Sequence, residues 1–199
     1  MRVIVISGPT CSGKTTLERG LETLGYRGVV GYTTRPKRKG EVDGVDYHFV
    51  TDREFDKLLD GRLLDVVNFG NMRYGKLQAD FVRLQQNSKG VVAVLEPSGA
   101  RLLRRTCEAA SIPFVGVWLD CNPSVQAERF IERLQTLSPD VAARRLAEML
   151  SIEQDWREWA RDGTLRCELR LTGSLFTVKQ LVEIVDRFAA NPDLDSHGF

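Results

Sequence analysis

A short stretch near the start of the chain, SGPTCSGKTTL at residues 7–17, carries residue types that suit the binding of a polyphosphate. Gly8, Gly13, Lys14 and Thr15 follow the pattern G-x-x-x-x-G-K-T directly after an apolar run. In such a loop, successive backbone N–H groups point into one concavity, and the positive end of the following helix adds to the same anion site. An ordinary strand-to-helix corner would explain the two glycines, but not a Lys-Thr pair at this offset. The motif therefore predicts a site for a nucleoside triphosphate.

The same motif gives its side chains separate tasks. We expect Lys14 to reach the β- and γ-phosphates, and the hydroxyl of Thr15 to help hold Mg²⁺. Thr15 is the protein ligand that we predict for the metal. The residues expected to bind the donor nucleotide all lie in this loop or in the first turn after it: Gly8, Ser12, Gly13, Lys14, Thr15 and Thr16.

A second group of cations follows in GYTTRPKRKGEVDGVDYHF at residues 31–49. Arg35, Lys37, Arg38 and Lys39 fall within five positions, and Tyr47 comes shortly after them. Two guanidinium groups beside a phenol can grip one phosphate bidentately. A solvated charged loop would have the same composition, so composition alone leaves both interpretations open.

The elements that must position these residues are indicated by the hydrophobic pattern. Short apolar runs at residues 2–7, 91–95 and 114–119, with a weaker run at 165–171, predict strands. Helical patterns occur at residues 14–24, 99–110, 123–134, 139–160 and 175–190. Strands that alternate with helices predict an α/β fold of the P-loop NTPase type, in which a parallel sheet carries helices on both faces.

Residues 32–75 interrupt this alternation. They are polar and rich in arginine, with short strand candidates at residues 47–50 and 63–69. We expect them to form an inserted lobe, while residues 1–31 and 76–190 form the core. Residues 191–199 have the composition of a flexible tail.

Composition excludes several classes of protein. The 199 residues include 28 Lys and Arg against 27 Asp and Glu, so no overall basic field predicts nucleic acid as a partner. The four cysteines are widely separated, which favours reduced thiols over a metal site. No apolar run approaches membrane-spanning length, and the chain enters a strand without a signal peptide. We therefore expect a soluble, cytoplasmic protein with no membrane partner.

Three longer stretches carry a family resemblance. VISGPTCSGKTTL is followed by TTRPKRKGEVDGVDYHF and then by EFDKLLDGRLLDVVNFGNMRYG. This combination resembles the guanylate kinase family, and the similarity continues more loosely to the last helix. The resemblance implies a nucleoside monophosphate kinase with ATP as phosphoryl donor. It also implies that the inserted lobe binds the acceptor monophosphate and that a helical lid lies near residues 129–145.

The resemblance implies that four residues bind the acceptor phosphate. Arg35 and Arg38 match the family's two phosphate-binding arginines, Tyr47 matches the tyrosine of D-Y-x-F, and Tyr74 matches the tyrosine before the glycine of N-Y-Y-G. The resemblance also implies a set of catalytic cations from the phosphate loop and the lid. That set is Lys14, Arg129, Arg133 and Arg145, with Arg144 as the alternative to the last. No general base is required, because a monophosphate oxygen is already anionic near neutral pH.

Base recognition departs from the family pattern at four positions. Gly31 stands where the family has serine, Asp65 where it has glutamate, and Lys76 where it has serine or threonine. The family's acidic strand end D-x-D-x-Q-G is VLEPSG here, so one acid is lost and the other is matched by Glu96. A site that hydrogen-bonds a base edge discriminates strongly, so these changes are expected to alter base selectivity more than chemistry.

The resulting prediction is ATP- and Mg²⁺-dependent phosphoryl transfer to a nucleoside monophosphate, with GMP or dGMP as the first expectation. A kinase for another or modified (deoxy)nucleoside monophosphate, such as one with a thymine-type base, is the alternative of the same class. A non-catalytic guanylate-kinase-like module that binds phosphorylated peptides is the alternative of a different class. The complete GPTCSGKT argues against that module, which needs neither Lys14 nor Thr15. The preferred base, the sugar and the choice between monomer and homodimer remain open.

Overall fold

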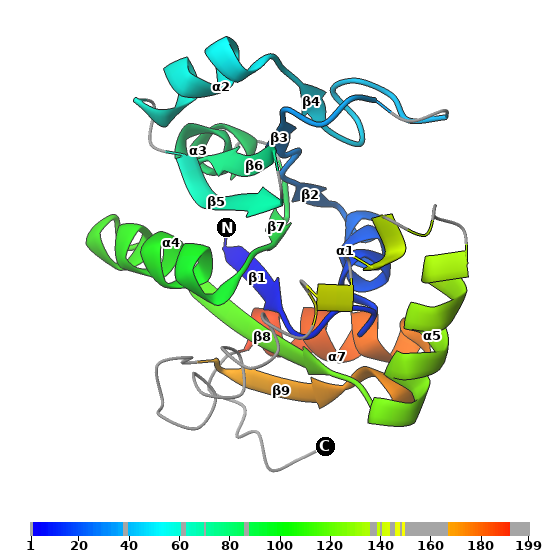
Figure 1. Cartoon of the computed structure of the whole chain (residues 1–199). Coiled ribbons are helices and arrows are strands. Elements are labelled where there is room, and N and C mark those ends of the chain that lie inside the picture. The colour runs from blue at the N-terminus through cyan, green and yellow to red at the C-terminus, as the bar shows by residue number, and fades with distance from the viewer. Residues whose placement is uncertain are drawn as a thin grey trace.

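The computed structural model describes residues 2–37, 40–60, 63–69, 71–85, 88–135, 139, 141–143, 146, 147, 149 and 167–191. These residues form two sheets with helices packed around them (Figure 1). We call the five-stranded sheet and its helices the core. The four-stranded sheet and α2 (Asp52–Leu59), at the top of Figure 1, are called the lobe.

The core sheet is parallel throughout. Its strand order is β2 (Tyr26–Gly28), β7 (Gly90–Val94), β1 (Val3–Ser7), β8 (Phe114–Asp120) and β9 (Leu169–Thr172). Apolar side chains of α1 (Lys14–Glu22) and α7 (Val178–Ala190) pack on one face, and those of α3 (Gln78–Gln85) and α4 (Pro97–Ala109) on the other. Strand β1 is buried along its whole length, as expected for a strand covered on both faces. The predicted α/β fold is therefore confirmed.

The lobe has a mixed sheet in the order β4 (His48–Phe49), β3 (Tyr32–Thr33), β6 (Met72–Leu77) and β5 (Leu63–Phe69). Strand β6 is antiparallel to both β3 and β5, and β3 is parallel to β4. Phe55 of α2 is fully buried over this sheet, close to Leu63 and Gly75. The predicted strand at residues 63–69 is confirmed, whereas the one predicted at 47–50 is shorter.

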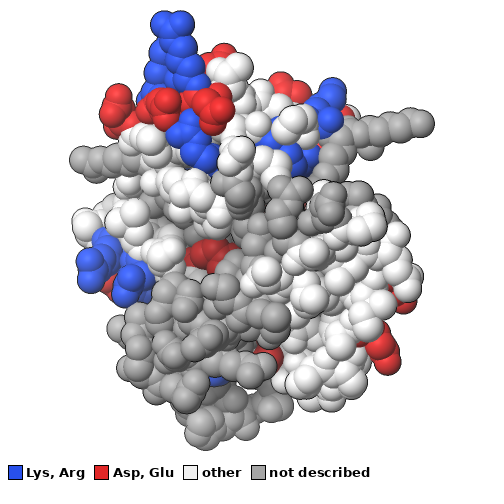
Figure 2. All heavy atoms as spheres, viewed as in Figure 1, with Lys and Arg blue, Asp and Glu red and all other residues white. Residues whose placement is uncertain are grey.

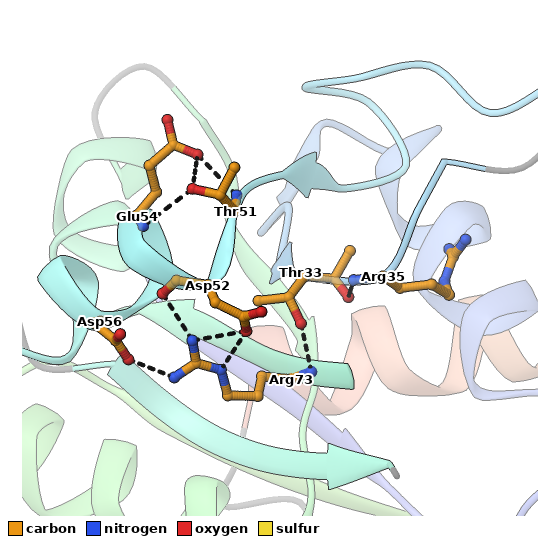
Figure 3. Close-up of polar contacts among 8 residues, drawn as sticks. Thr33, Arg35, Thr51, Asp52, Glu54, Asp56 and Arg73 are labelled. Carbon is orange, nitrogen blue, oxygen red and sulfur yellow. Dashed lines mark hydrogen bonds and ion pairs between the residues drawn. The ribbon is translucent and has the colours of Figure 1, made fainter. Parts of the chain in front are cut away.

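Helix α2 has a capped first turn and is bound to the lobe sheet by one arginine (Figure 3). Thr51 and Glu54 form a reciprocal capping box at its first turn. Arg73 of β6 donates to Asp52 at 2.9 Å and to Asp56 at 2.6 Å. These contacts fix the position of β6, the strand that carries two of the predicted site residues, Tyr74 and Lys76.

Some element boundaries differ from the sequence prediction for local reasons. Helix α1 ends at Glu22 because Gly25 turns the chain with a φ of +94°. Helix α7 begins at Val178, since residues Gly173–Leu175 form a short 3-10 turn and Thr177 caps the helix. The predicted helix at 139–160 lies mostly outside the described residues, although residues 139, 141–143, 146, 147 and 149 are helical. The predicted tail also lies outside them, apart from Asn191.

Charge is unevenly distributed over the face seen in Figure 2. Basic and acidic side chains lie intermixed over the lobe, at the top of the view, whereas much of the described surface below it carries no charge. Among the described helices, none is both long and apolar enough to cross a membrane.

Candidate active site

The phosphate loop connects β1 to α1, and its glycines are required by its shape. Gly8 has a φ of +150°, and a Cβ atom there would lie 2.1 Å from the carbonyl oxygen of Leu119. Gly13 has a φ of +100° at the N-cap of α1. No side chain caps this helix and no acidic residue lies in its first turn, so its N-terminal N–H groups face an anion site without competition.

Lys14 lies over the loop that it follows. Its ammonium donates to the carbonyl oxygens of Gly8 and Pro9, both at 2.7 Å. Ser12 is only 2% exposed, and its hydroxyl has no hydrogen-bond partner within the described part of the chain. A buried hydroxyl without a partner is costly, and a phosphate oxygen in the loop would satisfy it.

A cavity of about 540 Å³ opens on one side of the loop, and we call it the donor cavity. Its walls come from the loop, from the start of α7 and from α5 (Pro123–Gln135). Helix α5 contributes Arg129 and Arg133, both exposed. The guanidinium of Arg129 donates to the carbonyl oxygen of Cys11 at 3.2 Å, which joins the predicted lid to the loop. Arg144 and Arg145 lie outside the described residues.

A second cavity of about 560 Å³ lies between α1 and the lobe, and we call it the acceptor cavity. Arg35, Tyr47 and Tyr74 line it together. The rings of Tyr47 and Tyr74 meet edge to face with centroids 5.9 Å apart, and the guanidinium of Arg35 lies 5.6 Å from the centre of Tyr47. Burial and the neighbouring Tyr74 raise the pKa of Tyr47, so its phenol stays a hydrogen-bond donor at neutral pH. Arg38 lies outside the described residues.

Glu41 is a partner of Arg35 that the sequence prediction did not include. Its carboxylate accepts two hydrogen bonds from the Arg35 guanidinium, at 2.7 and 2.9 Å. Arg35 is 6% exposed, and its other contacts include the carbonyl oxygen of Pro36. The bidentate pair fixes the plane of the guanidinium beside the two tyrosines. Its position in the quoted G-E-V-D-G segment was the only sequence signal for it.

Three of the four positions that depart from the family pattern lie at the acceptor cavity. Gly31, Lys76 and Glu96 line it. A Cβ atom on Gly31 would lie 3.3 Å from the carbonyl oxygen of Gly75, so the absence of a side chain relieves close contact. The Lys76 ammonium donates to the carbonyl oxygen of Val29 at 2.5 Å. Asp65 lies in β5, and its side chain is outside the described part.

The two cavities meet at three residues. Lys14, Thr15 and Arg133 line both of them. A triphosphate in the loop and a monophosphate beside the lobe would therefore approach each other across two cations and a hydroxyl. This arrangement favours in-line transfer, which depends on position and charge neutralisation.

The residues around this junction fit a magnesium ion bound chiefly through phosphates. Thr15 provides a hydroxyl there, and Glu18 and Glu96 place carboxylates in the same cavity. Oxygen ligands are those that Mg²⁺ prefers, and it commonly keeps several waters beside substrate phosphates. Within the described residues, no group of three or more His, Cys, Asp and Glu side chains forms an all-protein metal site.

Comparison with known proteins shows which family this chain resembles. The family model described as guanylate kinase matches residues 1–156. The guanylate kinase of Symbiobacterium thermophilum is 36% identical over 165 residues, which cover 81% of this chain and 72% of that protein. The guanylate kinase of Rubrobacter xylanophilus is 31% identical over 198 residues, covering 96% of this chain and 97% of that one.

A solved structure shows the likeness of fold. The crystal structure of guanylate kinase from Anaplasma phagocytophilum matches with a TM-score of 0.60 at 16% identity, covering 98% of this chain and 87% of that one. The matched family model spans the phosphate loop, the lobe and the strands between them. The chain therefore belongs to the guanylate kinase family of P-loop nucleoside monophosphate kinases.

Proposed function

We propose that this chain transfers the γ-phosphoryl group of ATP, in the presence of Mg²⁺, to the phosphate of a nucleoside monophosphate. The observation that carries the proposal is the junction of the donor and acceptor cavities at Lys14, Thr15 and Arg133. ATP would occupy the donor cavity with its phosphates in the loop. The acceptor would occupy the other cavity, with its phosphate directed toward the junction.

The chain's own residues would act by holding and neutralising charge. Lys14, Arg129 and Arg133 would balance the charge that spreads over the transferring group, and the predicted role of Arg145 is the same. Magnesium, held in part by the Thr15 hydroxyl, would neutralise the charge of the donor phosphates. No residue has to remove a proton, since the attacking phosphate oxygen is already anionic.

The acceptor phosphate would be held on the lobe. Arg35, oriented by Glu41, would bind it together with the phenols of Tyr47 and Tyr74, which line the same cavity, and Arg38 is predicted to contribute a further cation. Guanidinium and phenol donors suit a phosphate dianion because each donates to a different oxygen.

We propose GMP or dGMP as the first acceptor, since the curated relatives compared above are guanylate kinases. Asp65 would accept from the N–H groups of the base, and Glu96 and Lys76 would lie near its edge. A thymine-type base is the second candidate. Lys76 lines the acceptor cavity, and its ammonium would suit a carbonyl oxygen, which thymine and uracil carry as guanine does.

The division into a core, a lobe at residues 32–75 and a lid near residues 129–145 implies closure over both substrates. Closure would bring the two anion sites together and exclude water from the junction. We propose that this occurs in a monomer or a homodimer.

The test is ADP release measured by a coupled assay with ATP, Mg²⁺ and each of GMP, dGMP, dTMP, dUMP, dCMP and dAMP. We expect acceptor-dependent ADP formation with at least one guanine or thymine-type monophosphate. Lys14→Ala is the control and should lose activity by several orders of magnitude while remaining folded. ADP release that does not depend on any monophosphate would contradict the proposal.

A further inference from the structure

The hydrogen bonds that pair the parallel strands β2 and β7 end next to the acceptor cavity. The last regular bond of this ladder runs from the N–H of Val29 to the carbonyl oxygen of Val92, at 3.2 Å. In a continued parallel ladder the N–H of Val94 would donate to the carbonyl oxygen of Val29. Instead, Val94 donates to the carboxylate of Glu18 at 3.3 Å, and Val29 accepts from the ammonium of Lys76.

Glu18 reaches this opening from the helix that follows the phosphate loop. It lies three residues after Thr15, so the two side chains share one face of α1. Both line the acceptor cavity, together with Lys14 and Glu96. Burial raises the pKa of Glu18, and the charge of Lys76 opposes this increase. The neighbouring carboxylate of Glu22 also raises the pKa of Glu18, whereas the hydrogen bond from the Val94 N–H lowers it.

Val94 occupies the strand position where the resemblance has the first acid of D-x-D-x-Q-G. Its side chain lines the acceptor cavity and packs against the hydrophobic cluster that includes Leu17 and Leu21 of α1. A carboxylate at position 94 would therefore point toward α1. Glu18, from α1, already places a carboxylate against the same residue.

We infer that Glu18 supplies, from α1, the carboxylate that the end of β7 lacks, and that it accepts hydrogen bonds from the hydration shell of the Mg²⁺ ion at the junction. It is a positioning residue, since it acts through water on the ion and not on the transferring group. The inference rests on the proposed function and on the fit of Thr15, Glu18 and Glu96 to a hydrated magnesium ion.

The test compares Glu18→Gln with Glu22→Gln. The glutamine at position 18 keeps an oxygen that can accept from the Val94 N–H, so it removes the charge while preserving the structural hydrogen bond. Glu22 lies one turn further along α1, lines the same cavity and accepts from the N–H of Gly28 at 3.2 Å, so it is a matched control.

The measured quantity is the affinity for the β,γ-imido analogue of ATP with and without Mg²⁺, by isothermal titration calorimetry. We expect Glu18→Gln to reduce the Mg²⁺-dependent gain in affinity about tenfold and to leave metal-free binding unchanged. Glu22→Gln should retain the wild-type gain. An unchanged gain in Glu18→Gln, or a change only in the ranking of acceptor bases, would overturn the inference.

A second-site variant tests the equivalence of the two positions. Adding Val94→Asp to Glu18→Gln should restore most of the Mg²⁺-dependent gain, and circular dichroism would establish that the double variant is folded. A folded double variant without restored gain would contradict the inference. The binding ratio does not depend on turnover, so a wild-type protein that fails to phosphorylate any monophosphate would refute the proposed function alone.

Discussion

The pair formed by Arg35 and Glu41 offers a direct test of how the acceptor phosphate is held. Glu41→Gln replaces a carboxylate that accepts two guanidinium hydrogen bonds by an amide with one acceptor oxygen. Arg35 is 6% exposed and Glu41 20% exposed, so the pair is largely shielded from water. Breaking a fully buried pair costs about 3–5 kcal/mol, and a hydrogen bond to a charged group contributes about 1.5–3 kcal/mol. Because one acceptor remains and Glu41 is partly solvated, we expect a loss of about 2 kcal/mol in the free energy of unfolding.

The same change should appear in acceptor binding. If about 1.4 kcal/mol of the loss reflects disorder of the Arg35 guanidinium in the folded protein, KM for the monophosphate rises about tenfold. KM for ATP should stay within about twofold, because the donor cavity does not include Arg35. The assay is steady-state ADP release with each substrate varied in turn, together with urea denaturation.

Asp43→Asn is the matched control for this experiment. Asp43 lies in the same segment and accepts from the N–H of Phe49, a bond that asparagine can keep, and the change removes one negative charge without altering the Arg35 pair. A fall in KM for the monophosphate in Glu41→Gln would show that Glu41 competes with the phosphate for Arg35. That result would refute the idea that Glu41 prepares the site.

Three further predictions concern the loop and the core. Gly8→Ala should destabilise the fold by about 2 kcal/mol or more in urea denaturation, since its Cβ would lie 2.1 Å from the Leu119 carbonyl oxygen; an unchanged midpoint would contradict the loop geometry. Cys11 lines the donor cavity, so ATP should slow its alkylation by a neutral maleimide, read by peptide mass spectrometry, whereas equal rates would place the nucleotide elsewhere. Burial alone would raise the pKa of Glu168, but hydrogen bonds from Arg104 and from a backbone N–H outweigh it and hold that pKa below 4.5. The charged Glu168 therefore stabilises the fold above pH 4.5, and this stabilisation is lost at lower pH. The loss in free energy of unfolding caused by Glu168→Gln should be smaller at pH 3 than at pH 7. An equal loss at both pH values would argue against the ion pair.

The phosphate loop and the α/β core could be predicted from sequence because their signals are local. Gly8, Gly13, Lys14 and Thr15 lie within one contiguous motif whose geometry fixes their spacing. The apolar runs of the buried parallel strands are also contiguous, so they indicated the core sheet without knowledge of tertiary contacts.

The lobe and the lining of the acceptor cavity were harder to predict. Strands β3 and β4 have two residues each, which is too short for a periodic pattern. Glu18 could not be identified as a site residue because its role depends on where β2 and β7 separate. The roles of all the site residues remain predictions, and Arg38 and Arg145 also lie outside the described part of the chain.

In the proposed reaction, the phosphoryl group passes directly from ATP to a bound monophosphate. The most direct measurement follows ATP labelled at its γ-phosphate, with Mg²⁺ and GMP, and separates the products by chromatography. We expect the label to appear in GDP in an amount equal to the ADP formed, and we expect Lys14→Ala to abolish both products. Direct transfer would be contradicted if the label appeared in inorganic phosphate and in no nucleoside diphosphate, whichever monophosphate was supplied.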